Sequence, residues 1–182
     1  MNRKEFIKKS CGIGAASAAA MAMAKTAGAQ TEGKKQTEKV DPSQRFKEQW
    51  IQTFLKNLDS QFDEKTRVRL MESCGRDCAR RGSVKMAETC KGDVDKLLDT
   101  LAGHIGKENA RREGNAVHLT YNECYCPLVA KGPARLSDTY CNCSRGWALE
   151  MFETVTGKPV KVVCLSSIKR GDAKCVFEVK LA

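Results

Sequence analysis

Apolar residues in the first half of the chain recur at three- and four-residue intervals, which is typical of amphipathic helices. The first stretch follows Asp41-Pro42, a pair that favours a helix start with Asp41 as the N-cap. We expect one face of this helix to pack on the core. That face carries Phe46, Trp50, Phe54, Leu55 and Leu58.

Three more helices are predicted before residue 106. Asp63 begins one that ends at Gly82, with Val68 and Met71 on its apolar face. A short helix follows over 83–90, and Gly92-Asp93 begins the last. Its apolar face carries Val94, Leu97, Leu98 and Leu101.

The period changes after Gly114. Residues 106–114 read as a charged loop, and 116–121 alternate as a half-buried strand does. A short strand is expected near 139–143, then a helix capped by Ser144 and closed by Gly157. Strands over 160–168 and 175–181 form a hairpin through a turn at 170–172. The sequence therefore predicts an α/β (α+β) fold, in which N-terminal helices pack on a C-terminal antiparallel sheet with one crossing helix and a final β-hairpin.

Residues 1–29 have the features of a signal peptide. A basic start is followed by an alanine-rich apolar run and by Ala27-Gly28-Ala29, a cleavage-site pattern. The stretch from Asn2 to Lys8 is similar to a twin-arginine export signal with Lys4 in place of the second arginine, so both the twin-arginine and the Sec route stay open. We expect a flexible linker over 30–40 and a single cysteine-rich domain over 41–182. The predicted location is the periplasm, without membrane attachment after cleavage.

The charge of the chain limits its partners. The formal net charge is +10, and residues 1–29 contribute +4 of it through five basic residues and one acid, which leaves +6. Basic residues are interleaved with acids and few aromatic residues accompany them, which disfavours nucleic acid as a partner. The hydrophobic content of 41% suits a folded domain rather than a disordered one. A small-molecule ligand is the expected partner, and the oligomeric state is left open.

Cysteines provide the most specific chemical pattern. Nine of the ten would remain after cleavage, an odd number, so disulfides alone cannot pair them all. Cys124-x-Cys126 and Cys141-x-Cys143, placed on neighbouring strands, would direct four sulfurs at one volume. Four thiolates suit tetrahedral zinc, although the spacing is not that of a zinc ribbon. Disulfides in an oxidising compartment and a catalytic thiol are the alternatives.

The remaining cysteines form two further groups. Cys74 and Cys78 lie four residues apart on the second helix, and Cys90 could reach back to them as a structural staple or as the third ligand of a metal site. A two-residue turn at Gly171-Asp172 would place Cys164 about 13 Å from Cys175. The two would then need other partners, with Cys141 or Cys143 as the nearest candidates.

The C-terminal half contains Cys124-x-Cys126, Tyr140-Cys141-x-Cys143, Gly146-Trp147, Gly157-Lys158-Pro159-Val160 and Ser167-Ile168-x-Arg170-Gly171-Asp172-x-x-Cys175-x-Phe177. These motifs resemble the vinyl-4-reductase-like small-molecule-binding domains and the L-2-amino-thiazoline-4-carboxylic acid hydrolase family. The stretch from Glu72 to Arg80 is similar to a motif of uncharacterised cysteine-rich bacterial exported proteins. The resemblance implies an antiparallel sheet with helices around a ligand pocket, and a zinc site near the final hairpin. Cys175 matches the last ligand there, Ser167 and Cys164 stand at two others, and Cys141 or Cys143 at a fourth.

Three functions follow from these observations. The first is an exported small-molecule-binding domain whose cysteine cluster (Cys124, Cys126, Cys141, Cys143, Cys164, Cys175) holds a structural zinc or forms disulfides. The second is a hydrolase of a cyclic C–N or thiazoline-type substrate, with His118, Glu123 or a cysteine as the working group. The third is a disulfide-stapled structural or interaction protein.

Overall fold

The computed structural model of the protein describes residues 41–129 and 135–182, all within one compact unit of the chain, Lys39–Ala182. The predicted signal peptide at 1–29 and linker at 30–40 lie outside the described residues. Among the helices that are described, none is long and apolar enough to cross a membrane.

Between residues 41 and 105 the structure contains four helices, as the apolar spacing predicts. They are α2 (Pro42–Gln61), α3 (Glu64–Gly82), α4 (Val84–Glu88) and α5 (Val94–Ile105). Asp41, Asp63 and Asp93 cap α2, α3 and α5, because each carboxylate accepts a hydrogen bond from a backbone N–H two or three residues further on. The helix starts predicted at Asp41 and Asp63 are therefore confirmed.

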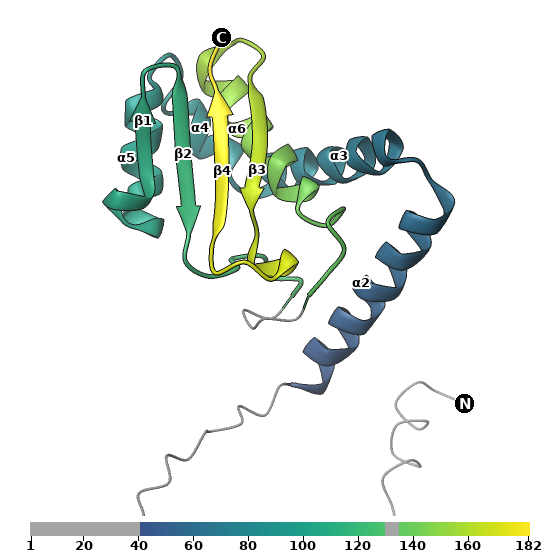
Figure 1. Ribbon diagram of the computed structural model, residues 1–182. Helices are drawn as coiled ribbons and strands as arrows, with labels where there is room; N and C mark the ends of the chain where they lie inside the picture. Colours follow the sequence, from purple (N-terminus) through teal and green to yellow (C-terminus); the bar gives the residue numbers. More distant parts are fainter. Residues whose placement is uncertain (1–40, 130–134) are drawn as a thin grey trace, which may run out of the picture. The chain divides into compact units, whose positions relative to one another are not determined.

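The C-terminal half contains an antiparallel sheet and one long helix. The strands are β1 (Ala110–Glu113), β2 (Ala116–Tyr121), β3 (Lys161–Ser166) and β4 (Cys175–Lys180), in the order β1-β2-β4-β3. Helix α6 (Asn142–Thr156) crosses between β2 and β3, and 3-10 turns η1 (Lys107–Asn109) and η2 (Ile168–Arg170) precede β1 and β4. Helices α4, α5 and α6 lie behind one face of the sheet (Figure 1). The predicted fold class is confirmed.

Two local predictions were wrong. The stretch 106–114 is not a loop throughout, because β1 pairs with β2 from Ala110 opposite Leu119 to Glu113 opposite Ala116. Its charged residues show no alternation of apolar and polar positions, so the sequence carries no strand signal there. Strand β1 forms because it pairs with β2. The strand expected near 139–143 does not form, since Cys143 N–H donates to the Tyr140 carbonyl and the chain already turns into α6.

The apolar face predicted for α2 is also corrected. Phe46, Trp50 and Phe54 are exposed, at 68%, 59% and 42%, and the rings of Trp50 and Phe54 stack at 5.5 Å. The buried residues are instead Ile51, Leu55 and Leu58. The helix carries apolar residues on two sides, and only one side meets the rest of the protein.

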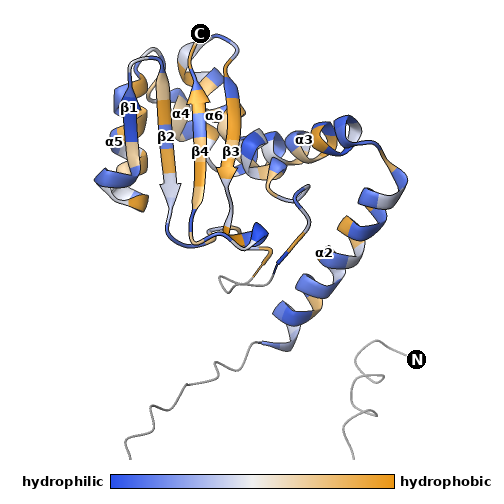
Figure 2. Cartoon of the chain, viewed as in Figure 1, coloured by the Kyte–Doolittle hydropathy of each residue, from blue (hydrophilic) through white to orange (hydrophobic). Residues whose placement is uncertain are grey.

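The main core, called here the sheet core, fills the space between the sheet and the helices. Val117, Leu119, Phe177 and Val179 cover the inner face of β2 and β4. Against them pack Leu97, Leu98 and Leu101 of α5 and Met151, Phe152 and Val155 of α6. Strands β2, β3 and β4 are visibly more hydrophobic than β1 or α2 (Figure 2).

Helices α3 and α6 cross with their backbones in contact. A Cβ atom added at Gly75 would lie 1.8 Å from the Cys143 carbonyl oxygen, and one at Gly146 would lie 2.0 Å from that of Glu72. Ion pairs flank the crossing. Arg76 contacts Glu150 and Glu153, Arg80 contacts Glu150, and Arg145 contacts Glu72. The motif from Glu72 to Arg80 therefore packs α3 on α6.

Candidate functional site

A second buried cluster, called here the α2 core, lies beneath α2. It consists of Ile51, Leu55, Leu58, Met71, Cys124, Val129, Leu136, Tyr140 and Cys141, with Cys126, Cys143 and Cys164 packed at its edge. Most of its members outside the helices come from the segment between β2 and α6. The described residues of this segment form no regular strand, so packing and turns rather than a sheet position their side chains.

Four of the six cysteines of the predicted cluster lie on other elements than expected. Cys124 and Cys126 follow the end of β2, and Cys141 and Cys143 stand at the start of α6 rather than on a strand. Cys164 and Cys175 lie on β3 and β4. These six are called the thiol group. Cys124 and Cys141 belong to the α2 core, and Cys126, Cys143 and Cys164 pack against it. Cys175 lies in the sheet core, against which Cys164 also packs.

Polar groups contact individual thiols of this set. The Cys126 sulfur lies 2.9 Å from the Tyr140 hydroxyl, and the Cys141 sulfur lies 2.8 Å from the Ser167 hydroxyl. The Cys175 sulfur accepts from the Ile168 N–H at 3.4 Å. Ser167 is itself fixed, because its N–H donates to the Asp172 carboxylate at 2.7 Å. The Ser167-to-Cys175 motif therefore provides the polar groups that contact the sulfurs of Cys141 and Cys175.

Burial keeps several thiols neutral. It raises the pKa of Cys141 and of Cys143 to about 12, and it raises the pKa of Cys124 and Cys164 as well. Lys169, only 1% exposed, opposes the rise at Cys124 through its positive charge. Because the thiolate is the nucleophile, these four cysteines are poorly suited to attack a substrate at neutral pH.

Cys164 and Cys175 lie nearer to each other than the turn prediction allows. Cys164 is opposite Phe177, so Cys175 is its diagonal neighbour on the adjoining strand. Such neighbours have Cα atoms about 7–8 Å apart. The predicted separation of about 13 Å is wrong, because the connection runs through η2 rather than a two-residue turn and a register shift separates Cys164 from Ser166.

The three N-terminal cysteines do not form the predicted staple. Cys90 is buried in the sheet core, where its sulfur lies 3.9 Å from the Thr100 hydroxyl. Cys74 and Cys78 are exposed on α3. Both help to raise the pKa of Cys143, which lies across the helix crossing. All nine cysteines of the described part of the chain are free thiols.

His118 does not join the thiol group. It lies on β2 between Val117 and Leu119, whose side chains enter the sheet core, so it projects from the opposite face. Its Nε2 is 4.0 Å from Glu113. Strand β2 ends at Tyr121, so Cys124 and Cys126 do not continue the strand that carries His118. Glu123 lies in the turn just after this strand.

The arrangement of the thiols was tested against a zinc site. Across residues 41–129 and 135–182, no group of three or more His, Cys, Asp or Glu side chains is arranged to hold a metal ion. Tetrahedral zinc requires about four donors around one point. The thiol group as it stands does not fit that requirement, and zinc binding stays a prediction.

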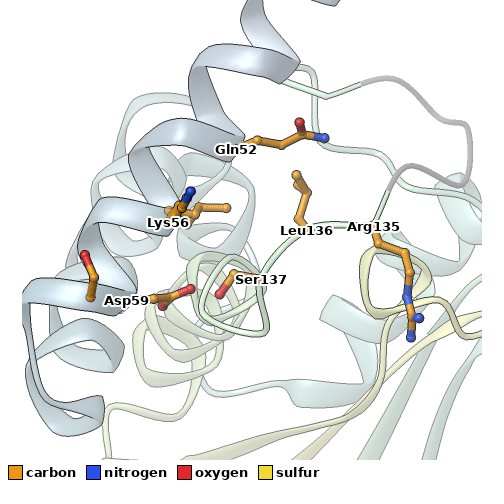
Figure 3. Close-up of a pocket in the computed structure, with 8 residues that line it drawn as sticks. Gln52, Lys56, Asp59, Arg135, Leu136 and Ser137 are labelled. Atoms are coloured by element: carbon orange, nitrogen blue, oxygen red, sulfur yellow. The ribbon is translucent and has the colours of Figure 1, made fainter.

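A pocket lies next to the thiol group, between α2 and residues 135–137, with a volume of about 500 Å³. Gln52, Lys56 and Asp59 project from α2 toward Leu136 and Ser137 (Figure 3). Leu55 and Leu136 line the pocket and also belong to the α2 core, so they separate the pocket from the thiols. The pocket is bounded by α2 and residues 135–137, and none of the residues that line it belongs to the final hairpin.

Asp59 fixes the geometry of this pocket. Its carboxylate accepts from Arg67 and from Thr139, both at 2.7 Å, which ties α2 to α3 and to the segment before α6. Although burial acts against it, hydrogen bonds from Ser137, Thr139 and Arg67 lower the pKa of Asp59. Sequence reasoning missed these residues. The only signal was the polar side of an amphipathic helix, which any exposed helix carries.

The fold and site define an α+β domain with a thiol-rich second core beside a ligand-sized pocket. The chain belongs to a protein family described as a family of unknown function (DUF6144), whose model matches residues 13–182. No curated protein matches the chain.

Proposed function

We propose that this protein is a small-molecule-binding domain whose ligand occupies the pocket between α2 and residues 135–137. The observation that supports the proposal is that the pocket and the α2 core share part of their lining. Leu55 and Leu136 line the pocket and pack in the α2 core with the thiols. The volume of about 500 Å³ lies within the range of small-molecule sites.

The lining favours a ligand with an apolar body and a polar end. Leu55 and Leu136 offer the apolar wall, while Lys56, Gln52 and Ser137 offer an ammonium, an amide and a hydroxyl. The Arg135 guanidinium donates to the Arg170 carbonyl from Nε and Nη2, at 2.9 and 2.6 Å, and so braces the wall of the pocket. A ligand with one acidic group would match Lys56 at the rim.

Retention of a small molecule by the purified protein tests this proposal. Wild-type protein is incubated with a bacterial metabolite extract, desalted, and examined by native mass spectrometry. Ser60 lines the pocket and Asn57 does not, although both are exposed on α2. We expect Ser60→Trp to fill the pocket and lose the retained compound, while Asn57→Trp keeps it. Equal retention by both variants, or no retention by the wild type, would contradict the proposal.

The same preparation tests the predicted zinc and the predicted disulfides. Metal content is measured on protein purified without chelator, and free thiols are counted after denaturation under acid. One zinc per chain would require the thiols to regroup around one centre, and it would be lost on replacing Cys141 and Cys175 together. Fewer than nine thiols in the mature chain would indicate oxidation and support the alternative of a disulfide-stapled protein.

A further inference from the structure

Three aromatic side chains of α2 lie outside both buried cores. Phe46, Trp50 and Phe54 follow one another at four-residue intervals, so they form one stripe along the helix, called here the aromatic stripe. They are 68%, 59% and 42% exposed, and the rings of Trp50 and Phe54 stack. None of the three lines the pocket. Contiguous exposed apolar surface of this kind marks an interaction site.

The charged residues of α2 are distributed unevenly around this stripe. At 3.6 residues per turn, Glu48 and Asp59 lie almost opposite Trp50, about 160–180° around the helix. The basic residues of the helix lie nearer to Trp50, at about 60°, 120° and 140°: they are Lys47, Lys56 and Arg45. Lysine and arginine side chains are long enough to reach round a helix. A negatively charged surface that met the stripe would therefore also meet these basic groups, while both acids point away from it.

The size of the stripe favours a lipid surface over a protein partner. At about 200 Å² for each aromatic side chain, the exposed fractions leave roughly 350 Å² open to solvent. A stable protein–protein interface buries about 800 Å² on each partner, more than twice this area. A lipid surface requires less area, because aromatic rings enter the headgroup region and the attraction between basic residues and anionic lipids adds to apolar burial.

We propose that the aromatic stripe docks the protein on an anionic lipid surface, with its rings among the headgroups and with Arg45 and Lys47 beside the lipid charges. Three rings and a few basic residues give reversible binding, since stable anchoring takes a larger apolar area. The proposal differs from the sequence-based expectation of a protein without membrane attachment. Neither Arg45 nor Lys47 lines the pocket, so the proposal does not depend on the proposed binding function.

The fluorescence of Trp50 tests this contact on the full-length protein. The chain has two tryptophans, and the other, Trp147, is half-buried in α6, where its Nε1–H donates to the Ser83 hydroxyl. Subtracting the emission of a Trp50→Phe variant from that of the wild type isolates the Trp50 signal. The protein is titrated with vesicles of phosphatidylcholine, alone or mixed with phosphatidylglycerol, whose acyl chains carry bromine as a quencher.

We expect the anionic vesicles to shift Trp50 emission to the blue and to quench it, and the neutral vesicles to do so much less. Phe46→Ser removes one ring of the stripe and should weaken the binding by about tenfold. Leu165→Ser is the matched control, because Leu165 is also exposed but lies on β3, and it should leave the binding unchanged.

The charge contribution is tested in the same titration. Arg45→Gln and Lys47→Gln should each weaken binding to the anionic vesicles by about fivefold, the effect of one basic residue near an anionic surface. Lys85→Gln makes the same change of net charge at an exposed position of α4 and should have no effect.

Three results would overturn the proposal. The first is Trp50 emission that anionic vesicles leave unchanged, and the second is equal quenching by neutral vesicles. The third is emission that is already shifted to the blue without lipid, because a second copy or another part of the protein would then cover the stripe. Neither tryptophan lies in residues 1–40, so the signal comes from the described domain. The measurement involves no retained compound, so its failure is distinct from failure of the proposed binding function.

Discussion

The sheet core and the α2 core lie in the same domain but are filled by different side chains. The sheet core contains mostly aliphatic residues, with two phenylalanines and the cysteines Cys90 and Cys175. The α2 core contains Cys124, Cys141 and Tyr140 among its nine buried residues, and three more cysteines pack at its edge. Figure 2 shows the same contrast, with hydrophobic inner strands and a mostly hydrophilic α2.

From this difference we infer that the sheet core stabilises the fold, while the α2 core borders the proposed binding pocket. A free cysteine packs as a small apolar residue, so Cys124 and Cys141 fill the α2 core together with its larger apolar side chains. It gains less from burial than the sheet core does, and α2 contributes only Ile51, Leu55 and Leu58 to it. We infer that α2 can move away from the thiols while the sheet stays intact.

Truncating one buried side chain in each core tests the comparison most strongly. Phe152 is fully buried in the sheet core, and Phe152→Ala should lower the free energy of unfolding by about 3–5 kcal/mol. Leu55→Ala should act mainly on α2. Hydrogen exchange followed by mass spectrometry should show faster exchange throughout with Phe152→Ala, and in α2 alone with Leu55→Ala. Faster exchange of the strands in Leu55→Ala would show that the two cores unfold together.

The glycine crossing of α3 and α6 should be the next most sensitive point, because it joins the two cores. Gly146→Ala places a Cβ 2.0 Å from the Glu72 carbonyl oxygen, so the helices must part, at about 1–3 kcal/mol or more. Gly103→Ala in α5 is the matched control, since a Cβ there meets nothing within 4 Å. It should stabilise the protein by up to about 1 kcal/mol. Urea unfolding measures both, and equal effects would contradict the close crossing.

Raising the pH above about 9 should destabilise the α2 core gradually, with a smaller effect than the substitutions described above. The pKa of Cys141 and of Cys143 is raised to about 12, so both thiols keep their protons when folded and lose them when unfolded, at about pH 9. Their contribution is full below about pH 9 and is lost as the pH rises toward 12. The slope is at most about 1.4 kcal/mol per pH unit for each thiol.

Urea unfolding in a reductant between pH 8 and 10.5 measures this dependence. The double variant Cys141→Ala/Cys143→Ala should show a flatter decline than the wild type, and Cys74→Ala, at an exposed position, should decline as the wild type does. An unchanged slope in the double variant would mean that these thiols are solvated in the folded protein.

Sequence patterns predicted the regular elements well where the local signal agreed with the final environment. Asp41-Pro42 and Asp63 mark helix starts because capping is a local interaction. The strand over 116–121 was predicted with its bounds, since one face is buried and the other is not. Strand β1 was missed because an exposed edge strand has no apolar face to alternate with.

The candidate site could be predicted only in part. The sequence marks Cys124, Cys126, Cys141 and Cys143 as a group, and all four lie in or against the α2 core. The strands assumed to carry them are, however, a turn segment and a helix start. The pocket had no sequence signal, because α2 and residues 135–137, which line it, lie far apart in the chain.

The amino-acid sequence by itself determined the helix caps, the alternation of β2, β3 and β4, and an unusual supply of thiols, because each depends on residues within a few positions of one another. Tertiary structure alone decided which side of α2 is buried and that Cys141 and Cys143 stand at the start of α6 rather than on a strand. It also decided the close approach of two helix backbones at Gly75 and Gly146, a contact between residues 71 positions apart that no local pattern encodes.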